Sequence, residues 1–141
     1  MQNPPDSDVR KMLEEAKVIA VVGHSDNPFR TSYQIAEYLR QAGYKVYPVN
    51  PTISEVNGEK SYPSVTEVPE PVDIVDVFRR PEYLEEVVED AIQAGAKNLW
   101  GQIGVYDQKA WEKAAEAGMG VVMDKCIKAH SSKACTIKVN I

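Results

Sequence analysis

The stretch that decides the fold runs from Lys17 to Ser32 and reads KVIAVVGHSDNPFRTS. Its five consecutive apolar residues, Val18 to Val22, predict a strand that is covered on both faces, as in a parallel sheet. Gly23 allows the backbone to turn sharply where this strand ends. Thr31 and Gln34 form a capping-box pattern, so we expect the next helix to begin at Thr31 or Ser32.

The turn between this strand and this helix has the features of an anion site. The free N–H groups of the first helical turn point back toward Gly23 and the residues that follow it. The positive end of the helix dipole lies behind those groups, and phosphate is the usual occupant of such a position. We therefore expect phosphate to bind between Gly23 and Ser32.

Working outward, apolar strand patterns alternate with helical patterns along the rest of the chain. Three predicted helices end in Ala-Gly followed at once by strand residues, at 42–44, 94–96 and 117–119. This repetition predicts βα units that are wound in one direction. The predicted fold is α/β, a Rossmann-like, doubly wound, mainly parallel five-stranded sheet with helices on both faces. The expected strands are 18–22, 44–49, 72–78, 97–103 and 119–123, and the expected helices begin at 6 or 7, 31 or 32, 81 and 107.

The chain has 141 residues, which predicts a single domain over residues 1–141 with a sizeable core. We expect residues 1–5 to be a loose tail. Residues 50–71 are rich in Pro and turn residues, which predicts turns and one short helix in a functional loop. Residues 131–141 form a C-terminal tail, in which the alternation over Thr136–Ile141 predicts an added edge strand or a contact with a neighbouring subunit.

The overall charge and hydropathy exclude several classes of protein. The formal net charge is −5 and no basic run offsets it, which disfavours nucleic acid as a partner. No apolar segment approaches the ~20 residues that a membrane-spanning helix needs. The first residues, MQNPPD, lack signal-peptide character. We therefore expect a cytoplasmic protein without a membrane partner.

Ligands of such folds bind outside the carboxyl ends of the strands. The loops at that edge are 23–32, 50 onward, 78–81 and 102–107, and polar and cationic residues gather in them. Gly23 is not followed by the second and third glycines of G-x-G-x-x-G, and no acid follows the second strand, which disfavours NAD. The G-x-x-x-x-G-K-[ST] pattern is also missing, so a nucleoside triphosphatase is not expected.

Seven short motifs carry a resemblance to a known family. They are VVGxS at 21–25, NPxRxSY at 27–33, GYxV at 43–46, VNP at 49–51, VDIVDVFRR at 72–80, WxQxGV at 100–105 and VVMDxC at 121–126. In these motifs, which span roughly residues 8 to 130, the chain resembles the small CoA-binding domain proteins. That family is related to the CoA-binding half of the succinyl-CoA synthetase α subunit.

The resemblance implies coenzyme A as the ligand, with its phosphates near the first turn. The synthetase uses a phosphorylated histidine in a second domain that has no counterpart in these residues, so its catalysis is not implied. His24 stands where the family more often has a small residue. The candidate cofactor-binding residues are Gly23, His24, Ser25, Asn27, Pro28, Arg30, Thr31, Ser32, Asn50, Pro51, Phe78, Arg79 and Arg80.

Structural explanations compete with some of these assignments. Arg79 and Arg80 could instead be solvated surface charges, an explanation that applies more to Arg80 than to Arg79. His24 is expected to be a turn residue or a ligand neighbour rather than a catalytic base. Cys126, His130 and Cys135 have the spacing C-x3-H-x4-C, which is one ligand short of a structural zinc site, so no metal is expected. Cys126 is expected to be a buried structural cysteine, and Trp100 and Trp111 are expected in the core.

Two functions remain open at this point. The first is a module that binds CoA or an acyl-CoA without catalysis of its own, alone or with a protein partner. The alternative is a small enzyme that depends on NAD(P) or on an acyl-CoA. The missing glycine pattern and the missing acid after the second strand favour the first.

Overall fold

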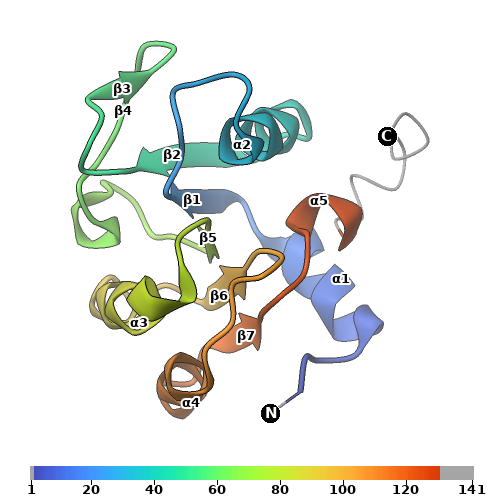
Figure 1. Ribbon diagram of the computed structural model, residues 1–141. Helices are drawn as coiled ribbons and strands as arrows, with labels where there is room; N and C mark the ends of the chain where they lie inside the picture. The colour runs from blue at the N-terminus through green and yellow to red at the C-terminus, as the bar shows by residue number, and fades with distance from the viewer. Residues whose placement is uncertain (1, 131–141) are drawn as a thin grey trace.

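The computed structural model describes residues 2–130, and a five-stranded parallel sheet forms its centre (Figure 1). The strand order is β2-β1-β5-β6-β7, so the chain reverses its direction of winding between β1 and β5. The predicted Rossmann-like fold is confirmed. The strands are β1 (Val18–Val22), β2 (Lys45–Val49), β5 (Ile74–Val77), β6 (Asn98–Gly101) and β7 (Gly120–Val122).

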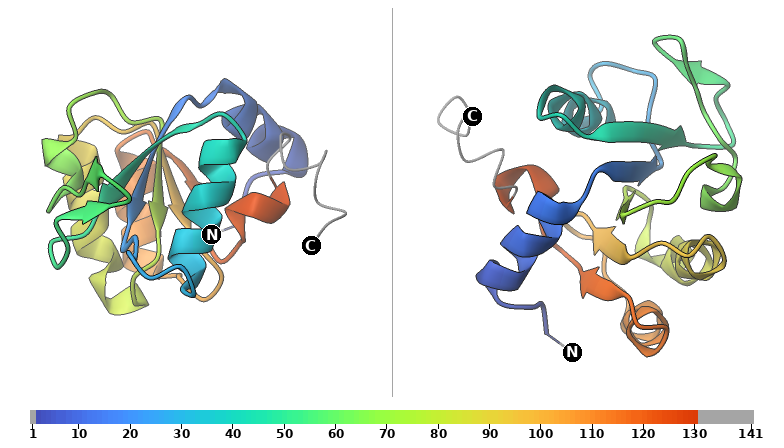
Figure 2. Two further views of the ribbon diagram at one scale, coloured as in Figure 1. Left: turned by 90° about the horizontal axis from the view of Figure 1, so that it is seen from above. Right: turned by 180° about the vertical axis from the view of Figure 1, so that it is seen from behind.

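Helices cover both faces of the sheet (Figure 2). On one face, α1 (Asp6–Glu15), α2 (Thr31–Gln41) and α5 (Ile127–His130) pack against Ile19, Val21 and Trp100. On the other face, α3 (Leu84–Gln93) and α4 (Gln108–Glu116) pack against Ala20 and Val75. The 3₁₀ turn η2 (Pro81–Tyr83) leads into α3, with Pro81 at the first position.

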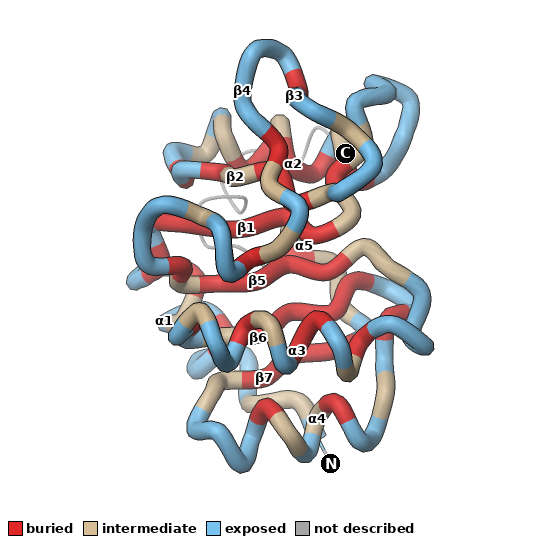
Figure 3. The backbone as a smooth tube through the Cα atoms, turned by 90° about the vertical axis from the view of Figure 1, so that its left-hand side faces the viewer, coloured by how far each residue is buried: buried red, intermediate tan, exposed pale blue. Residues whose placement is uncertain are grey.

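The alternation of side chains along the strands explains the two cores. Successive residues of a strand point to opposite faces of the sheet. Because helices cover both faces, every residue of β1 and of β5 is buried, and their apolar side chains are divided between two core clusters, one on each face. Figure 3 shows the five strands of the parallel sheet as mainly buried tube, with the exposed residues concentrated in the connecting segments and on the outer sides of the helices. Among residues 2–130, no helix combines the length and apolarity that crossing a bilayer requires.

The segment between β2 and β5 contains more regular structure than its turn-rich sequence predicts. The expected short helix is present as the 3₁₀ turn η1 (Val65–Glu67). A hairpin of β3 (Glu55–Val56) and β4 (Glu59–Lys60) was not expected, and the Asn57-Gly58 dipeptide forms its turn with positive φ at both residues. The α5 helix was also not expected.

The N-terminal segment of the chain is bound to the sheet by two hydrogen bonds of one side chain. Asn3 donates its side-chain amide to the carbonyl of Met123 and accepts the N–H of the same residue, both at 2.9 Å. The N-terminal segment is thus anchored to the edge of the sheet at Asn3, where a loose tail was expected. The predicted edge strand at Thr136–Ile141 lies outside the described residues.

Candidate functional site

Three loops meet at the carboxyl edge of the sheet, beside the point where the winding reverses. The N–H of Gly23 donates to the carbonyl of Val49 at 2.8 Å, and the N–H of Phe78 donates to the carbonyl of Val22 at 2.8 Å. Gly23 has φ +88°, and a Cβ atom there would lie 2.6 Å from the carbonyl oxygen of Phe78. Only glycine therefore fits where these loops touch, which the sequence predicts for the sharp turn.

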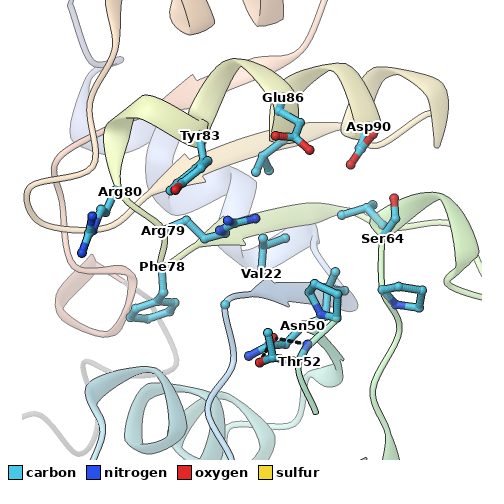
Figure 4. Close-up of a pocket in the computed structure, with 16 residues that line it drawn as sticks. Val22, Asn50, Thr52, Ser64, Phe78, Arg79, Arg80, Tyr83, Glu86 and Asp90 are labelled. Atoms are coloured by element: carbon cyan, nitrogen blue, oxygen red, sulfur yellow. Dashed lines mark hydrogen bonds between the residues drawn. The ribbon is translucent and has the colours of Figure 1, made fainter. Parts of the chain in front are cut away.

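Two adjoining cavities open at this junction, with volumes of about 390 and 570 Å³. They share Gly23, Asn50, Thr52 and Phe78, so the meeting loops form the boundary between them. We call the larger one the turn pocket, because it is lined by the β1–α2 turn and the first residues of α2. We call the smaller one the α3 pocket, because its outer wall is η2 and α3 (Figure 4).

The turn pocket ends at the N-terminus of α2, and this helix end has no side-chain cap. The capping box predicted from Thr31 and Gln34 is wrong, because the N-cap residue is Arg30 and the Gln34 amide donates to the carbonyl of Pro28 at 3.2 Å. Ser32 Oγ accepts the N–H of Ser25 at 3.0 Å. The helix N–H groups are therefore left for a ligand or for water, as an anion site requires.

The α3 pocket has apolar walls and contains the side chain of one arginine, which a contact with an aromatic ring holds in position. Figure 4 shows the Arg79 side chain reaching into the space beside Val22, whereas Arg80 points away from it. The Arg79 guanidinium lies over the Tyr83 ring, 4.3 Å from its centroid, which is a cation–π contact. Arg80 is exposed and pairs with Glu82 at 3.6 Å. Arg79 is thus the cation that the structure directs into the pocket.

Asn50 ties the two loops of the junction together. Its side-chain amide donates to the carbonyl of His24 at 3.0 Å. Its Oδ1 accepts from the N–H and the hydroxyl of Thr52, at 2.9 and 2.7 Å. The backbone carbonyl of Asn50 accepts from Ser61 Oγ at 3.0 Å. Because its amide is already used in this way, Asn50 shapes the site more than it offers free hydrogen-bonding groups.

Most of the predicted residues come together at this edge. Those that line one or both pockets are Gly23, Ser25, Arg30, Thr31, Ser32, Asn50, Pro51, Phe78, Arg79 and Arg80. Asn27 and Pro28 lie in the same turn but line neither pocket. The His24 side chain is fully buried beneath the turn, and burial lowers its pKa to about 4. A neutral, buried imidazole fits the expected turn residue and not a base that faces a ligand.

Several lining residues were missed by the sequence analysis. Asp26 and Phe29 belong to the predicted turn, and Phe29 is 90% exposed. Tyr83 stands four residues after Arg79, and its ring lies under the Arg79 guanidinium. Ser64 and Val65 reach the α3 pocket only because of the path of the long β2–β5 connection, for which the sequence carries no signal.

The residues considered for metal binding do not form a cluster within the described part of the chain. No group of three or more His, Cys, Asp or Glu side chains that could hold a metal occurs among residues 2–130. Cys126 is half-buried against the core and was expected to be buried, and Cys135 lies outside the described residues. Trp100 is fully buried, as predicted, while Trp111 packs partly buried against the other cluster.

The fold and the site define a Rossmann-like α/β domain whose candidate ligand site lies at the carboxyl edge of its sheet. The sequence model of the CoA binding domain family matches residues 17–132, and the chain belongs to that family. This confirms the resemblance found in the sequence motifs.

The most similar proteins include stand-alone chains and parts of larger ones. The uncharacterized protein YneT of Bacillus subtilis is 44% identical over 132 residues, which cover 93% of this chain and 98% of YneT. A hypothetical protein from Pyrococcus horikoshii OT3 has 41% identity and a TM-score of 0.88, with 92% and 94% of the two chains covered. The α subunit of the ADP-forming acetate–CoA ligase II of Pyrococcus furiosus is 30% identical over 120 residues, which cover 77% of this chain but 26% of that subunit.

Proposed function

We propose that this protein binds coenzyme A or an acyl-CoA at the carboxyl edge of its sheet, with phosphate groups in the turn pocket. The observation that carries the proposal is the uncapped N-terminus of α2, which opens into a cavity next to a second, apolar-walled one. Membership of the CoA binding domain family supports the choice of ligand. The similar α subunit is named as part of an acetate–CoA ligase, which agrees with this choice of ligand.

The charge of the ligand explains why arginines are needed. Coenzyme A carries a pyrophosphate and a separate ribose 3′-phosphate, which is more negative charge than one helix end can balance. The protein itself has a net charge of −5, so the additional positive charge has to be local. Arg30 lines the turn pocket and Arg79 reaches into the α3 pocket. We assign the phosphates to these two side chains together with the helix end.

Beyond Arg79, the α3 pocket suits a part of the ligand that carries no charge. Val22, Val49, Val65 and Val87 line it, and apolar walls of this kind favour a flat base. Glu86 and Asp90 lie at its far end (Figure 4) and would repel a phosphate there. Their carboxylates can instead accept hydrogen bonds from an exocyclic amine. We therefore place the adenine in this pocket.

We propose that the domain binds its ligand without catalysing a reaction on its own. Neither pocket is lined by a histidine or a cysteine among the described residues. Both ring nitrogens of His24 are engaged by protein atoms, and its ring is buried. If a reaction involves this domain, a protein partner supplies the catalytic groups, as the much longer ligase subunit that it resembles suggests.

Removing either arginine is expected to weaken CoA binding without unfolding the protein. A charge-assisted hydrogen bond to phosphate contributes roughly 1.5–3 kcal/mol, so Arg30→Ala and Arg79→Ala should each lower the affinity about ten- to a hundredfold. Isothermal titration calorimetry with CoA measures the loss, and dephospho-CoA shows which arginine contacts the 3′-phosphate. Arg10→Ala, on α1 and outside both pockets, is the matched control. Unchanged affinity in both pocket variants would show that the site is misplaced.

A further inference from the structure

His24 lies directly beneath the anion-binding turn, and its contacts determine where its proton is. Nδ1 is 2.8 Å from the carbonyl oxygen of Ser25, and Nε2 is 3.3 Å from Nη2 of Arg40. A carbonyl oxygen can only accept a hydrogen bond and a guanidinium can only donate one. Nδ1 therefore carries the proton and Nε2 accepts from Arg40. Both neighbours select the same neutral tautomer.

The bond to Ser25 has a consequence for the next peptide group. The described residues contain no cis peptide bond, so the carbonyl of Ser25 and the N–H of Asp26 point in opposite directions. Because that carbonyl is directed at the buried ring, the Asp26 N–H is directed away from the ring. Ser25 and Asp26 both line the turn pocket. The Asp26 N–H is thus turned toward the side on which the pocket lies.

The neighbouring donors of the turn are already occupied. The N–H of Ser25 donates to Ser32 Oγ at 3.0 Å, and the N–H of Asn27 donates to Ser25 Oγ at 3.0 Å. Within residues 2–130, no acceptor takes the N–H of Asp26. Between Ser25 and Asn27, this N–H is therefore the donor that remains for an anion.

We propose that His24 is a positioning residue of the phosphate site, which holds the Ser25 carbonyl so that the Asp26 N–H faces the ligand. Arg40, which also pairs with Glu37 at 3.1 Å, donates to the far side of the ring. Its positive charge polarises the imidazole and strengthens the hydrogen bond from Nδ1–H to the Ser25 carbonyl. The same peptide group then becomes a better donor at Asp26. The inference rests on the proposed binding of CoA at this turn.

The first test does not depend on any ligand. Long-range ¹H–¹⁵N correlation spectra identify the tautomer of a neutral histidine, and the chain contains only one other histidine, His130. His130→Leu removes the second signal and assigns the first. We expect His24 to carry its proton on Nδ1. A proton on Nε2 would mean that the ring does not hold Ser25, and the inference would be abandoned.

The second test measures CoA affinity in variants that fold. His24→Leu removes the donor, and we expect the affinity to fall roughly tenfold, the value of one hydrogen bond. His24→Asn keeps an N–H near the position of Nδ1 and is expected to recover part of the loss. His130→Leu, outside both pockets, is the matched control and should bind like the wild type.

Amide spectra separate positioning from a general structural effect. On addition of CoA, the Asp26 amide signal of the wild type is expected to move, and in His24→Leu its movement should be smaller. Wild-type affinity in His24→Leu would overturn the inference and leave the proposed function standing. Failure of the wild type itself to bind CoA would overturn both.

Discussion

Replacing Asp76 with asparagine is expected to stabilise the protein, and the gain is expected to increase between pH 4 and pH 8. Asp76 is fully buried in the central strand β5. Its Oδ1 accepts from the side-chain amide of Gln102 at 2.6 Å, and among the described residues nothing bonds its Oδ2. Burial raises the pKa of this carboxyl from 3.8 to about 7, and the bond from Gln102 offsets only part of that rise.

The direction of the pH dependence follows from this raised pKa. Below pH 3.8 the carboxyl is protonated in both the folded and the unfolded protein and does not favour either. As the pH rises from 3.8 to about 7, the unfolded protein ionises while the folded one resists, so stability is lost, and above about 7 the loss is complete. At about 1.4 kcal/mol for each pH unit between the two pKa values, the loss reaches at most about 4 kcal/mol. Asparagine resembles the neutral acid and avoids this loss.

Urea denaturation of Asp76→Asn and wild type at several pH values measures the effect. Asp73→Asn is the matched control. Asp73 directly precedes β5, and removing its charge is expected to have the opposite effect on stability. Although partial burial works against ionisation, the N–H groups of Lys17 and Val18 and the Lys97 ammonium together lower the pKa of Asp73. Asp73→Asn should therefore destabilise at neutral pH and less in acid. A destabilised Asp76→Asn at pH 8 would contradict our account of this carboxyl.

Gly23→Ala is expected to destabilise the fold by roughly 2–5 kcal/mol and to remove CoA binding. An alanine at φ +88° is strained by roughly 1–2 kcal/mol. Its Cβ would also lie 2.6 Å from the Phe78 carbonyl, and relieving such an overlap in a packed region adds about 1–3 kcal/mol. The backbone shift that relieves the overlap would separate the loops that form both pockets.

Gly58 provides a control with nearly the same backbone strain. Its φ is +86°, and an added Cβ would meet nothing within 4 Å. Gly58→Ala is therefore expected to lose only the roughly 1–2 kcal/mol of backbone strain and to bind CoA normally. Thermal melts and CoA titrations of both variants isolate the contact with Phe78. Equal effects of the two substitutions would show that this contact does not hold the loops together.

The fold could be predicted because its signals are local. The buried run from Val18 to Val22 and the repeated Ala-Gly helix ends depend only on neighbouring residues, and the structure has the strands and helices they indicate. The β3–β4 hairpin was missed since strands of two residues are too short to show alternation. Its Asn57-Gly58 turn was the one available signal.

The site could be predicted only as far as the loops that form it. The edge of a parallel sheet fixes which loops meet, so residues of the first turn, of the β2 end and of the β5 end were correctly grouped. The burial of His24 could not be foreseen, because the ring lies against Arg40, which is 16 residues further along the chain, near the end of α2. The capping box failed because the helix begins one residue early, with Arg30 as its N-cap, and the Gln34 amide donates to the carbonyl of Pro28.

The measurement that tests the central claim most directly is the melting temperature of the wild-type protein with CoA, acetyl-CoA, NAD, NADP and ATP. A ligand that binds only the folded state adds about 2.7 kcal/mol at a hundredfold excess over its Kd, which moves the melting temperature of a domain of this size by several degrees. We predict such a rise with CoA or acetyl-CoA and none with NAD. A rise with NAD and none with CoA would contradict the assignment of this site to coenzyme A.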